Sequence, residues 1–236
     1  MSMSLAGMAL AGSVLFAPTA AFALPEEQIL EKLTRIPVFM IVNEGGQSLT
    51  ASVDVEGDDD LQVPIVFIDS DEAEAFIEDA ESENAALSDD AQIVILPLSD
   101  VYAEAVSQLN DADSLVYVPS AASVSQASQI LEREIQGVPL YAAVDLERDQ
   151  YLLTGDDTLP MFFSLADLQT QVATLIESNP DIQDAIGVEI TTFETVLDNM
   201  EANDPEIDPF LERVQFIPDS ATLEYLQSLS EQERAE

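Results

Sequence analysis

The sequence predicts an α+β protein made of two similar ββ-β-α-β-α-β-α halves, related by a pseudo-two-fold axis and preceded by an amphipathic helix. Three observations predict this fold. The 236 residues are 47% apolar, with ten Phe and five Tyr, so the chain can bury a core despite its net charge of −41. Three apolar runs occur twice in the same order. Short β-branched and aromatic runs alternate with stretches in which apolar residues have helical spacing.

Each duplicated run contains a proline, which aligns the two copies. The copies are 36–42 with 138–144, 63–67 with 159–163, and 115–120 with 214–219. Between the shared prolines the offsets are 102, 96 and 99 residues, and offsets this similar indicate a duplication. We place the first half at 36–134 and the second at 135–236. Because the junction between them is short and polar, we expect the two halves to form one compact body.

Local patterns define the elements of the N-terminal helix and the first half. Ile29, Leu30 and Leu33 lie on one face of a helix, and Asp69 or Ser70 can cap the helix that follows the third strand. The expected order is a helix at 24–35, a hairpin of 36–42 and 49–53 around 43–46, a strand at 63–68, a helix from Asp71, a strand at 92–96, a helix at 99–108, a strand at 114–118 and a helix at 120–132.

The second half is expected to repeat this order. Its hairpin joins 138–144 to 151–154 through a turn at 146–149, and its third strand is 159–163. A helix follows whose apolar stripe consists of Leu168, Val172, Leu175 and Ile176. The last strand of the repeat is 214–217.

The charge composition is that of a protein adapted to high salt. Asp and Glu number 47 against six Lys and Arg, and Lys32 is the only lysine. Salt at molar concentration shortens the screening length to roughly 3 Å, which removes most of the self-repulsion of such a chain. Calcium binding or a basic partner would also explain the acids. Nucleic acid and anionic membrane surfaces are excluded as partners, because both require Lys and Arg.

Residues 1–23 are predicted to be a signal peptide for export. An apolar run from Leu5 to Phe16 is followed by Ala21-Phe22-Ala23, a small-x-small cleavage site before Leu24. No Lys or Arg precedes the run, so an N-terminal membrane anchor is the alternative. After removal of this segment we expect no integral membrane segment.

The residue types exclude most catalytic chemistry. The chain has no His and no Cys, and therefore no histidine base, thiol nucleophile or usual structural zinc site. A pair of carboxylates is the only catalytic arrangement left open. We therefore expect a protein that is not an enzyme, without catalytic, cofactor-binding or metal-binding residues. Calcium at 58–60, 69–72 or 156–157 is the alternative to solvated acidic turns.

Large apolar side chains on the strands are the candidate binding residues. In 63–68, alternate residues point to opposite faces, and both sets are apolar. Such a strand is covered on both faces, or one face is an open groove for apolar polypeptide segments. The groove candidates are Phe39, Met40, Phe67, Tyr141, Met161, Phe162 and Phe163; burial in the core is the alternative for each of them.

The repeated proline-containing strands, the opening helix from Glu26 to Leu33 and the junction 136–140 resemble the Tic-twenty-two-like (Tic22-like) family. The resemblance covers about 25–229. It implies a butterfly-like body with apolar grooves, located in the periplasm of a cyanobacterium, here a halophilic one, with a thylakoid-associated pool left open. In plastid relatives it implies the intermembrane space. This chain departs from the family in its acidity and its lack of lysine.

The resemblance also implies a function. It implies a soluble chaperone-like protein that binds unfolded outer-membrane precursors, assists the outer-membrane β-barrel insertase and serves outer-membrane biogenesis and protein translocation. Two alternatives remain. One is a periplasmic module that binds calcium or a small ligand, and the other is a structural partner of the insertase that has no cargo site.

Overall fold

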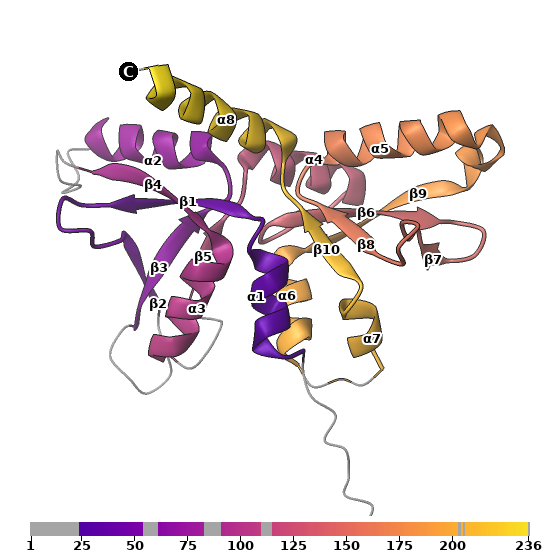
Figure 1. Cartoon of the computed structure of the whole chain (residues 1–236), viewed down its shortest axis with the longest axis horizontal. Coiled ribbons are helices and arrows are strands. Elements are labelled where there is room, and N and C mark those ends of the chain that lie inside the picture. The colour runs from indigo at the N-terminus through magenta and orange to yellow at the C-terminus, as the bar shows by residue number, and fades with distance from the viewer. Residues whose placement is uncertain are drawn as a thin grey trace, which may run out of the picture.

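Two five-stranded mixed sheets lie side by side, like two wings, in the computed structural model (Figure 1). The structure describes residues 24–53, 61–82, 91–109, 115–202, 204 and 206–235. The predicted signal peptide and the acidic run 58–60 lie outside these residues. Among the residues described, no helix is long and apolar enough to cross a membrane.

The first sheet contains the strands of the first half. The elements are β1 (Pro37–Val42), β2 (Thr50–Val53), β3 (Leu61–Phe67), α2 (Ser70–Ser82), β4 (Gln92–Pro97), α3 (Leu98–Leu109), β5 (Val116–Val118) and α4 (Ala121–Leu131). The central strand β1 pairs antiparallel with β3 and β4, while β3 also pairs antiparallel with β2 and parallel with β5. The predicted order of elements is therefore confirmed. The predicted hairpin of β1 and β2 is wrong, because beyond an isolated bridge between Val42 and Ser48 the strand β2 pairs with β3 instead.

The second sheet repeats this arrangement. Its elements are β6 (Pro139–Asp145), β7 (Gln150–Tyr151), β8 (Leu159–Phe162), α5 (Leu165–Ser178), η2 (Pro180–Ala185), β9 (Ile186–Thr192), α6 (Phe193–Glu201), α7 (Asp208–Leu211), β10 (Val214–Ile217) and α8 (Ser220–Ala235). Here β6 is central, between β8 and β9, and β10 pairs parallel with β8. The short strand β7 pairs with β6 rather than with the third strand of its half. The predicted α+β class is confirmed.

The strand pairing corrects one offset of the repeat. Phe39 pairs with Phe67, and its counterpart Tyr141 pairs with Phe162. Phe67 therefore corresponds to Phe162, 95 residues later, and not to Phe163 as the shared prolines had indicated. Because successive strand residues point to opposite faces, this one-residue shift changes which side chains are equivalent on each face.

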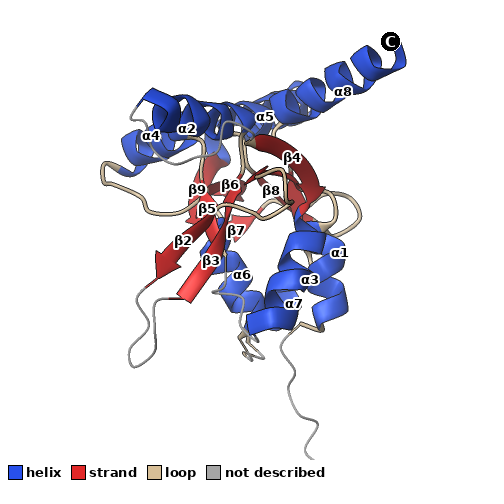
Figure 2. Ribbon diagram, turned by 90° about the vertical axis from the view of Figure 1, so that its left-hand side faces the viewer, coloured by secondary structure: helices blue, strands red, loops and turns tan. Residues whose placement is uncertain are grey.

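The strands form a middle layer between two layers of helices. Figure 2 shows α2, α4, α5 and α8 on one side, and α1 (Glu26–Leu33), α3, α6 and α7 on the other. The second side holds the largest core, which contains residues of both halves. The rings of Tyr117 in β5 and Phe193 in α6 meet there at 5.2 Å, across the boundary between the halves. Burial of this shared apolar surface holds the two halves together.

The last helix of each half covers the sheet of the other half. In α8, Tyr225 and Leu226 pack against a cluster built around Phe39 and Phe67. In α4, Ala127 is buried against the equivalent cluster around Tyr141 in the second sheet. The hydroxyl of Tyr141 donates a hydrogen bond to the backbone oxygen of Ser123 in α4, at 2.9 Å. Each half thus depends on a helix supplied by the other.

The junction between the halves is held in one conformation. Gly137 has a φ of +91°, which a glycine adopts without steric cost. A Cβ at this position would lie 2.6 Å from a carboxylate oxygen of Glu194. That carboxylate accepts the backbone N–H of Val138 at 3.0 and 3.1 Å. The predicted junction is therefore a fixed turn at the start of β6.

Candidate functional site

The seven predicted groove residues lie in the core. Each has 6% or less of its surface exposed. Some of them belong to the core shared by both halves. The others belong to two smaller clusters, one beneath α2 and α8 and the other beneath α4 and α5. The groove interpretation is therefore wrong for Phe39, Met40, Phe67, Tyr141, Met161, Phe162 and Phe163. The physical reason is that helices cover both faces of both sheets.

The sheets instead expose apolar residues at their outer edges. Strand β4 pairs with β1 on one side and with no described strand on the other. Of its side chains, Ile95 and Leu96 are 37% and 36% exposed. Between Gln92 and Pro97 the strand carries no charged residue, in a chain of net charge −41.

The pairing of β4 shows which backbone groups face the open edge. The N–H of Leu98 donates to the carbonyl oxygen of Ile36 at 2.8 Å, so residues 98, 96, 94 and 92 point their backbone groups toward β1. The alternate residues Ile93, Ile95 and Pro97 therefore point theirs outward. The open edge offers the N–H and carbonyl groups of Ile93 and Ile95, whereas the carbonyl of Pro97, the residue before α3, accepts the first hydrogen bond of that helix. Proline at the last position removes the third donor.

The second sheet has the equivalent open edge at β9. Tyr141 pairs with Ile190 as Phe39 pairs with Ile95, so the two strands correspond residue by residue. Val188 is 37% exposed, like Ile95. Figure 1 places β4 in the left half and β9 in the right half.

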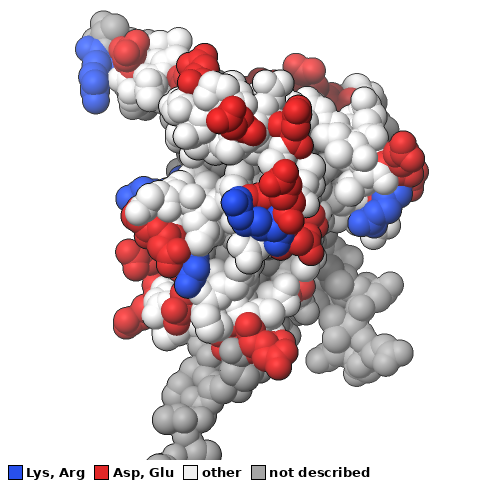
Figure 3. All heavy atoms as spheres, turned by 90° about the vertical axis from the view of Figure 1, so that its right-hand side faces the viewer, with Lys and Arg blue, Asp and Glu red and all other residues white. Residues whose placement is uncertain are grey.

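Among the charged residues of the surface, acids outnumber cations. Figure 3 shows the face on the side of the second half, where patches of Asp and Glu are separated by uncharged residues and only a few Lys and Arg lie among them. With 47 acids against six cations in the chain, the surface is well hydrated, which favours solubility of a complex.

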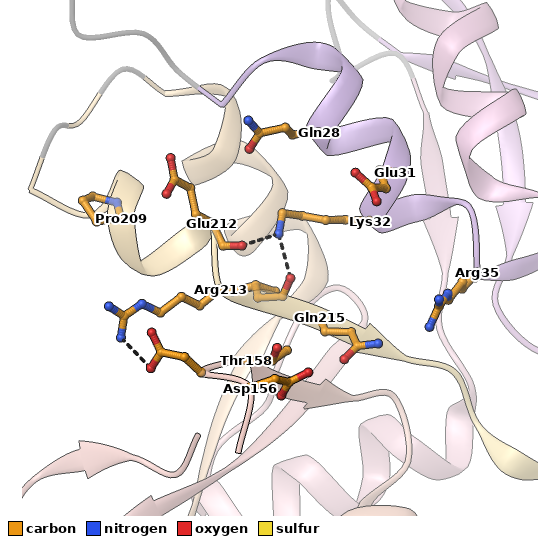
Figure 4. Close-up of a pocket in the computed structure, with 12 residues that line it drawn as sticks. Gln28, Glu31, Lys32, Arg35, Asp156, Thr158, Pro209, Glu212, Arg213 and Gln215 are labelled. Atoms are coloured by element: carbon orange, nitrogen blue, oxygen red, sulfur yellow. Dashed lines mark hydrogen bonds and ion pairs between the residues drawn. The ribbon is translucent and has the colours of Figure 1, made fainter. Parts of the chain in front are cut away.

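A polar recess of about 890 Å³ lies between α1 and the β10 region (Figure 4). Lys32, Arg35 and Arg213, half of the cations of the chain, line it together with Glu31, Asp156, Asp157 and Glu212. The ammonium of Lys32 donates to the carbonyl oxygens of Glu212 and Val214, each at 2.8 Å, and burial lowers its pKa. Arg213 pairs with Asp157 at 3.3 Å. Two of the three cations therefore tie α1 to β10 and β10 to the neighbouring loop.

The acidic clusters within the described residues have structural partners. Asp69 accepts the backbone N–H of Asp71 at 3.0 Å, and Glu72 accepts that of Ala121 at 2.7 Å. Thr154 donates to Asp156. Within the described ranges, no group of three or more acids is placed to hold a metal ion.

Comparison with known proteins identifies the family. Residues 4–228 match the Tic22-like family. The chain belongs to this family. The predicted resemblance is thereby confirmed over nearly the whole sequence. No curated protein sequence matches the chain.

Two solved structures of Tic22 proteins share the fold of this Tic22-like protein. One is described as "Anabaena Tic22 (protein transport)"; it has a TM-score of 0.66 and 22% identity, over 87% of this chain and 97% of that one. The other is Tic22 from Plasmodium falciparum, with a TM-score of 0.59 and 19% identity, over 86% and 97% of the two chains. At these identities the similarity concerns the fold alone.

The open edge of β4 was not among the predicted site residues. Residues 91–99 form a charge-free run, but so do 114–131 and 135–144, so this property does not distinguish the edge strand. A charge-free run is also typical of a buried central strand. Only the pairing of β4 shows that it lies at the edge of its sheet.

Proposed function

We propose that this Tic22-like protein is a chaperone-like factor of protein transport. It binds extended segments of unfolded outer-membrane precursors and does not change them covalently. The observation that carries the proposal is the open, charge-free edge of β4. We further propose that it acts in the periplasm of a cyanobacterium living in brine, delivers its cargo to the outer-membrane β-barrel insertase and is not an enzyme.

Strand addition is the binding mode that this edge favours. An extended segment can pair with outward N–H and C=O groups through its backbone, whatever its side chains are. Ile93 and Ile95 supply both kinds of group in alternation. Segments of outer-membrane barrels are themselves strands of alternating polarity, which suits them to this pairing.

Apolar contact adds to the backbone pairing. Ile95 faces the side of α2 and α8, and Leu96 faces the side of α3, so each face of an added strand meets one partly exposed apolar side chain. A cross-strand apolar pair stabilises a sheet by roughly 0.2–1 kcal/mol. Such binding is weak per residue, as suits a carrier that must release its cargo.

The comparison with Anabaena Tic22 supports the proposal. That protein is described by the words "protein transport" and has the same fold over 87% of this chain. Membership of the Tic22-like family supports a role in translocation in the same way. Neither match concerns the cargo. That the cargo is an outer-membrane precursor is what the family resemblance implies, and the edge of β4 supports its binding as an extended segment.

In the experiment, an unfolded β-barrel outer-membrane protein is diluted out of urea with and without this protein. The buffer contains about 2 M sodium chloride, at which the screening length is below about 3 Å. Light scattering follows aggregation. We expect suppression by the wild type and its loss in Ile95→Pro, which removes one outward N–H without breaking a bond to β1.

Ile95→Ala is the matched control, because it shortens the same side chain and keeps the N–H group. It should retain most of the suppression. If the wild type does not suppress aggregation, or if Ile95→Pro suppresses it as well as the wild type, the proposal is wrong.

The recess beside α1 favours the second candidate, a small-ligand module. Arg35 is the one cation lining the recess for which the structure gives no hydrogen bond or ion pair within the described residues. Such a module predicts thermal stabilisation by a small anion or by calcium at matched ionic strength. A shift of the unfolding temperature lost in Arg35→Gln would support this candidate over the first.

A further inference from the structure

We propose that β9 is a second strand-addition site, so that one molecule holds two extended segments at once. This inference rests on the proposed function of β4. Its evidence is separate from that for β4, because it comes from the register of β9 against β6. It also assigns a chemical preference, since the two edges differ in charge.

The register fixes which groups of β9 face outward. The N–H of Phe193 donates to the carbonyl oxygen of Val138, and the N–H of Leu146 donates to that of Ala185, both at 2.8 Å. Between these two bonds the alternation leaves Ile186, Val188, Ile190 and Thr192 with backbone groups pointing away from β6. None of these four residues is proline. This edge therefore offers four N–H groups and three C=O groups, because the carbonyl of Thr192, the N-cap of α6, accepts the first hydrogen bond of that helix. It still offers more groups than the edge of β4.

Within the described residues, no strand pairs with β9 on its outer side. The exposed pair Val188 and Glu189 lies in the middle of the strand. The side chain of Val188 points to the side of α4 and α5, whereas that of Glu189 points to the opposite side, because its partner Ala142 belongs to the shared core. An added segment would lie alongside both.

Glu189 gives the β9 edge its chemical preference. The described part of the chain contains two ion pairs, and Glu189 belongs to neither. Because Val188 and Ile190 would form the hydrogen-bonded pairs with an added strand, Glu189 would face its opposite residue in a non-hydrogen-bonded pair, where side chains lie closest. Opposite charges at such a position are favourable and like charges unfavourable. The occupant is therefore an extended segment of an unfolded outer-membrane protein with Lys or Arg opposite Glu189.

The two edges lie in different halves of the molecule (Figure 1), so their occupants do not compete for the same space. A client with two strand segments joined by a flexible linker can bind both edges. Binding the second segment is then intramolecular, and avidity on the order of a hundredfold follows if the linker spans the edges.

The test measures binding of a fluorescent peptide of about ten residues, the length of a membrane β-strand. The peptide alternates apolar and polar residues and has one central lysine. Sedimentation equilibrium gives the stoichiometry. We expect two peptides per chain for the wild type, one for Ile95→Pro, one for Val188→Pro and none for the double variant.

Val188→Ala is the control for the lost side chain and should still bind two peptides. A peptide N-methylated at every residue has no backbone donor on either edge; it tests the same point without changing the protein, and it should not bind. In Glu189→Lys the β9 site should prefer a peptide with a central glutamate. The preference is measured in the Ile95→Pro background.

The outcomes separate this inference from the proposed function. One peptide per wild-type chain, lost in Ile95→Pro, overturns the second site and leaves the first intact. No peptide bound at all overturns both. Unchanged preference in Glu189→Lys overturns the charge assignment, and a dimer of this chain abolished by Val188→Pro would make a second copy the occupant instead.

Discussion

Asp167 in α5 accepts two hydrogen bonds from Ser220, one from its backbone N–H at 2.8 Å and one from its hydroxyl at 2.6 Å. Ser220 is the first residue of α8, the helix that covers the sheet of the other half. The carboxylate of Asp167 therefore fixes where α8 begins. Glu72 in α2 has the equivalent role for α4, through the N–H of Ala121. In each half, the helix over the half's own sheet (α2 or α5) thus binds the first residue of the helix that crosses to the other sheet (α4 or α8).

Asp167→Ala should lower the free energy of unfolding by about 1 kcal/mol, the usual cost of losing a helix cap. Urea unfolding in brine, followed by circular dichroism, measures it. Glu177→Ala removes one acid from the exposed side of the same helix and should leave the unfolding free energy nearly unchanged. Equal effects of the two substitutions would contradict a capping role.

Phe39→Ala should destabilise the protein by about 3–5 kcal/mol, because it removes a fully buried ring that packs on Tyr225 at 6.2 Å. Phe76→Ala, at a ring 38% exposed, should cost much less. Unfolding in urea measures both. A small loss in Phe39→Ala combined with a loss of client binding would restore the groove interpretation.

Gly137→Ala and Gly46→Ala form a matched pair. Both glycines have positive φ, +91° and +74°, so each alanine should cost about 1 kcal/mol of left-handed strain. Only the Cβ at 137 would meet Glu194, while that at 46 meets no atom within 4 Å. We therefore expect Gly137→Ala to unfold at a distinctly lower urea concentration than Gly46→Ala. Identical midpoints would show that the junction can move away from Glu194.

Stability should depend on pH through Glu194. Burial raises the pKa of this carboxyl above its ordinary value. The backbone N–H groups of Glu194 and Val138 oppose the shift, and the neighbouring Asp198 adds a smaller increase. The folded state thus holds the proton more tightly than the unfolded state. The stabilisation that results from protonated Glu194 is present at pH values below the ordinary pKa of a glutamate and is lost as the pH rises through the raised pKa of Glu194.

Glu194→Gln should abolish that part of the pH dependence. The free energy of unfolding, measured from pH 4 upward in brine, should fall less steeply for Glu194→Gln than for the wild type. Glu177→Gln is the control for the loss of one exposed acid. A wild-type slope retained in Glu194→Gln would assign the effect to other acids.

Salt should stabilise the fold by screening. Raising sodium chloride from about 0.05 M to about 1 M shortens the screening length from above 10 Å to about 3 Å, and the midpoint of thermal unfolding should rise accordingly. Calcium chloride at matched ionic strength should give the same shift. A much larger effect of millimolar calcium would mean that the acidic clusters are calcium sites.

Local composition and spacing were enough to predict most elements, although not η2 and α7. The short apolar, β-branched and aromatic runs that became β1, β3 and β6 are typical of strands covered on both faces, and the apolar stripe of α5 is typical of a helix covered on one side. Phe67 and Phe163 show the limit of this reasoning. The shared prolines aligned them, yet strand pairing makes Phe162 the equivalent of Phe67, since pairing depends on a distant strand.

By itself, then, the sequence determined the α+β class, the duplicated order of elements and the acidic surface, all of which depend on local spacing and composition. The tertiary structure alone decided that α4 and α8 exchange sheets, that Phe39 and Tyr141 are core, and that β4 and β9 are open edges. An apolar strand looks the same in sequence at the centre and at the edge of a sheet. Which it becomes depends on whether a neighbour pairs with its outward N–H and C=O groups, and that neighbour lies far away in the chain.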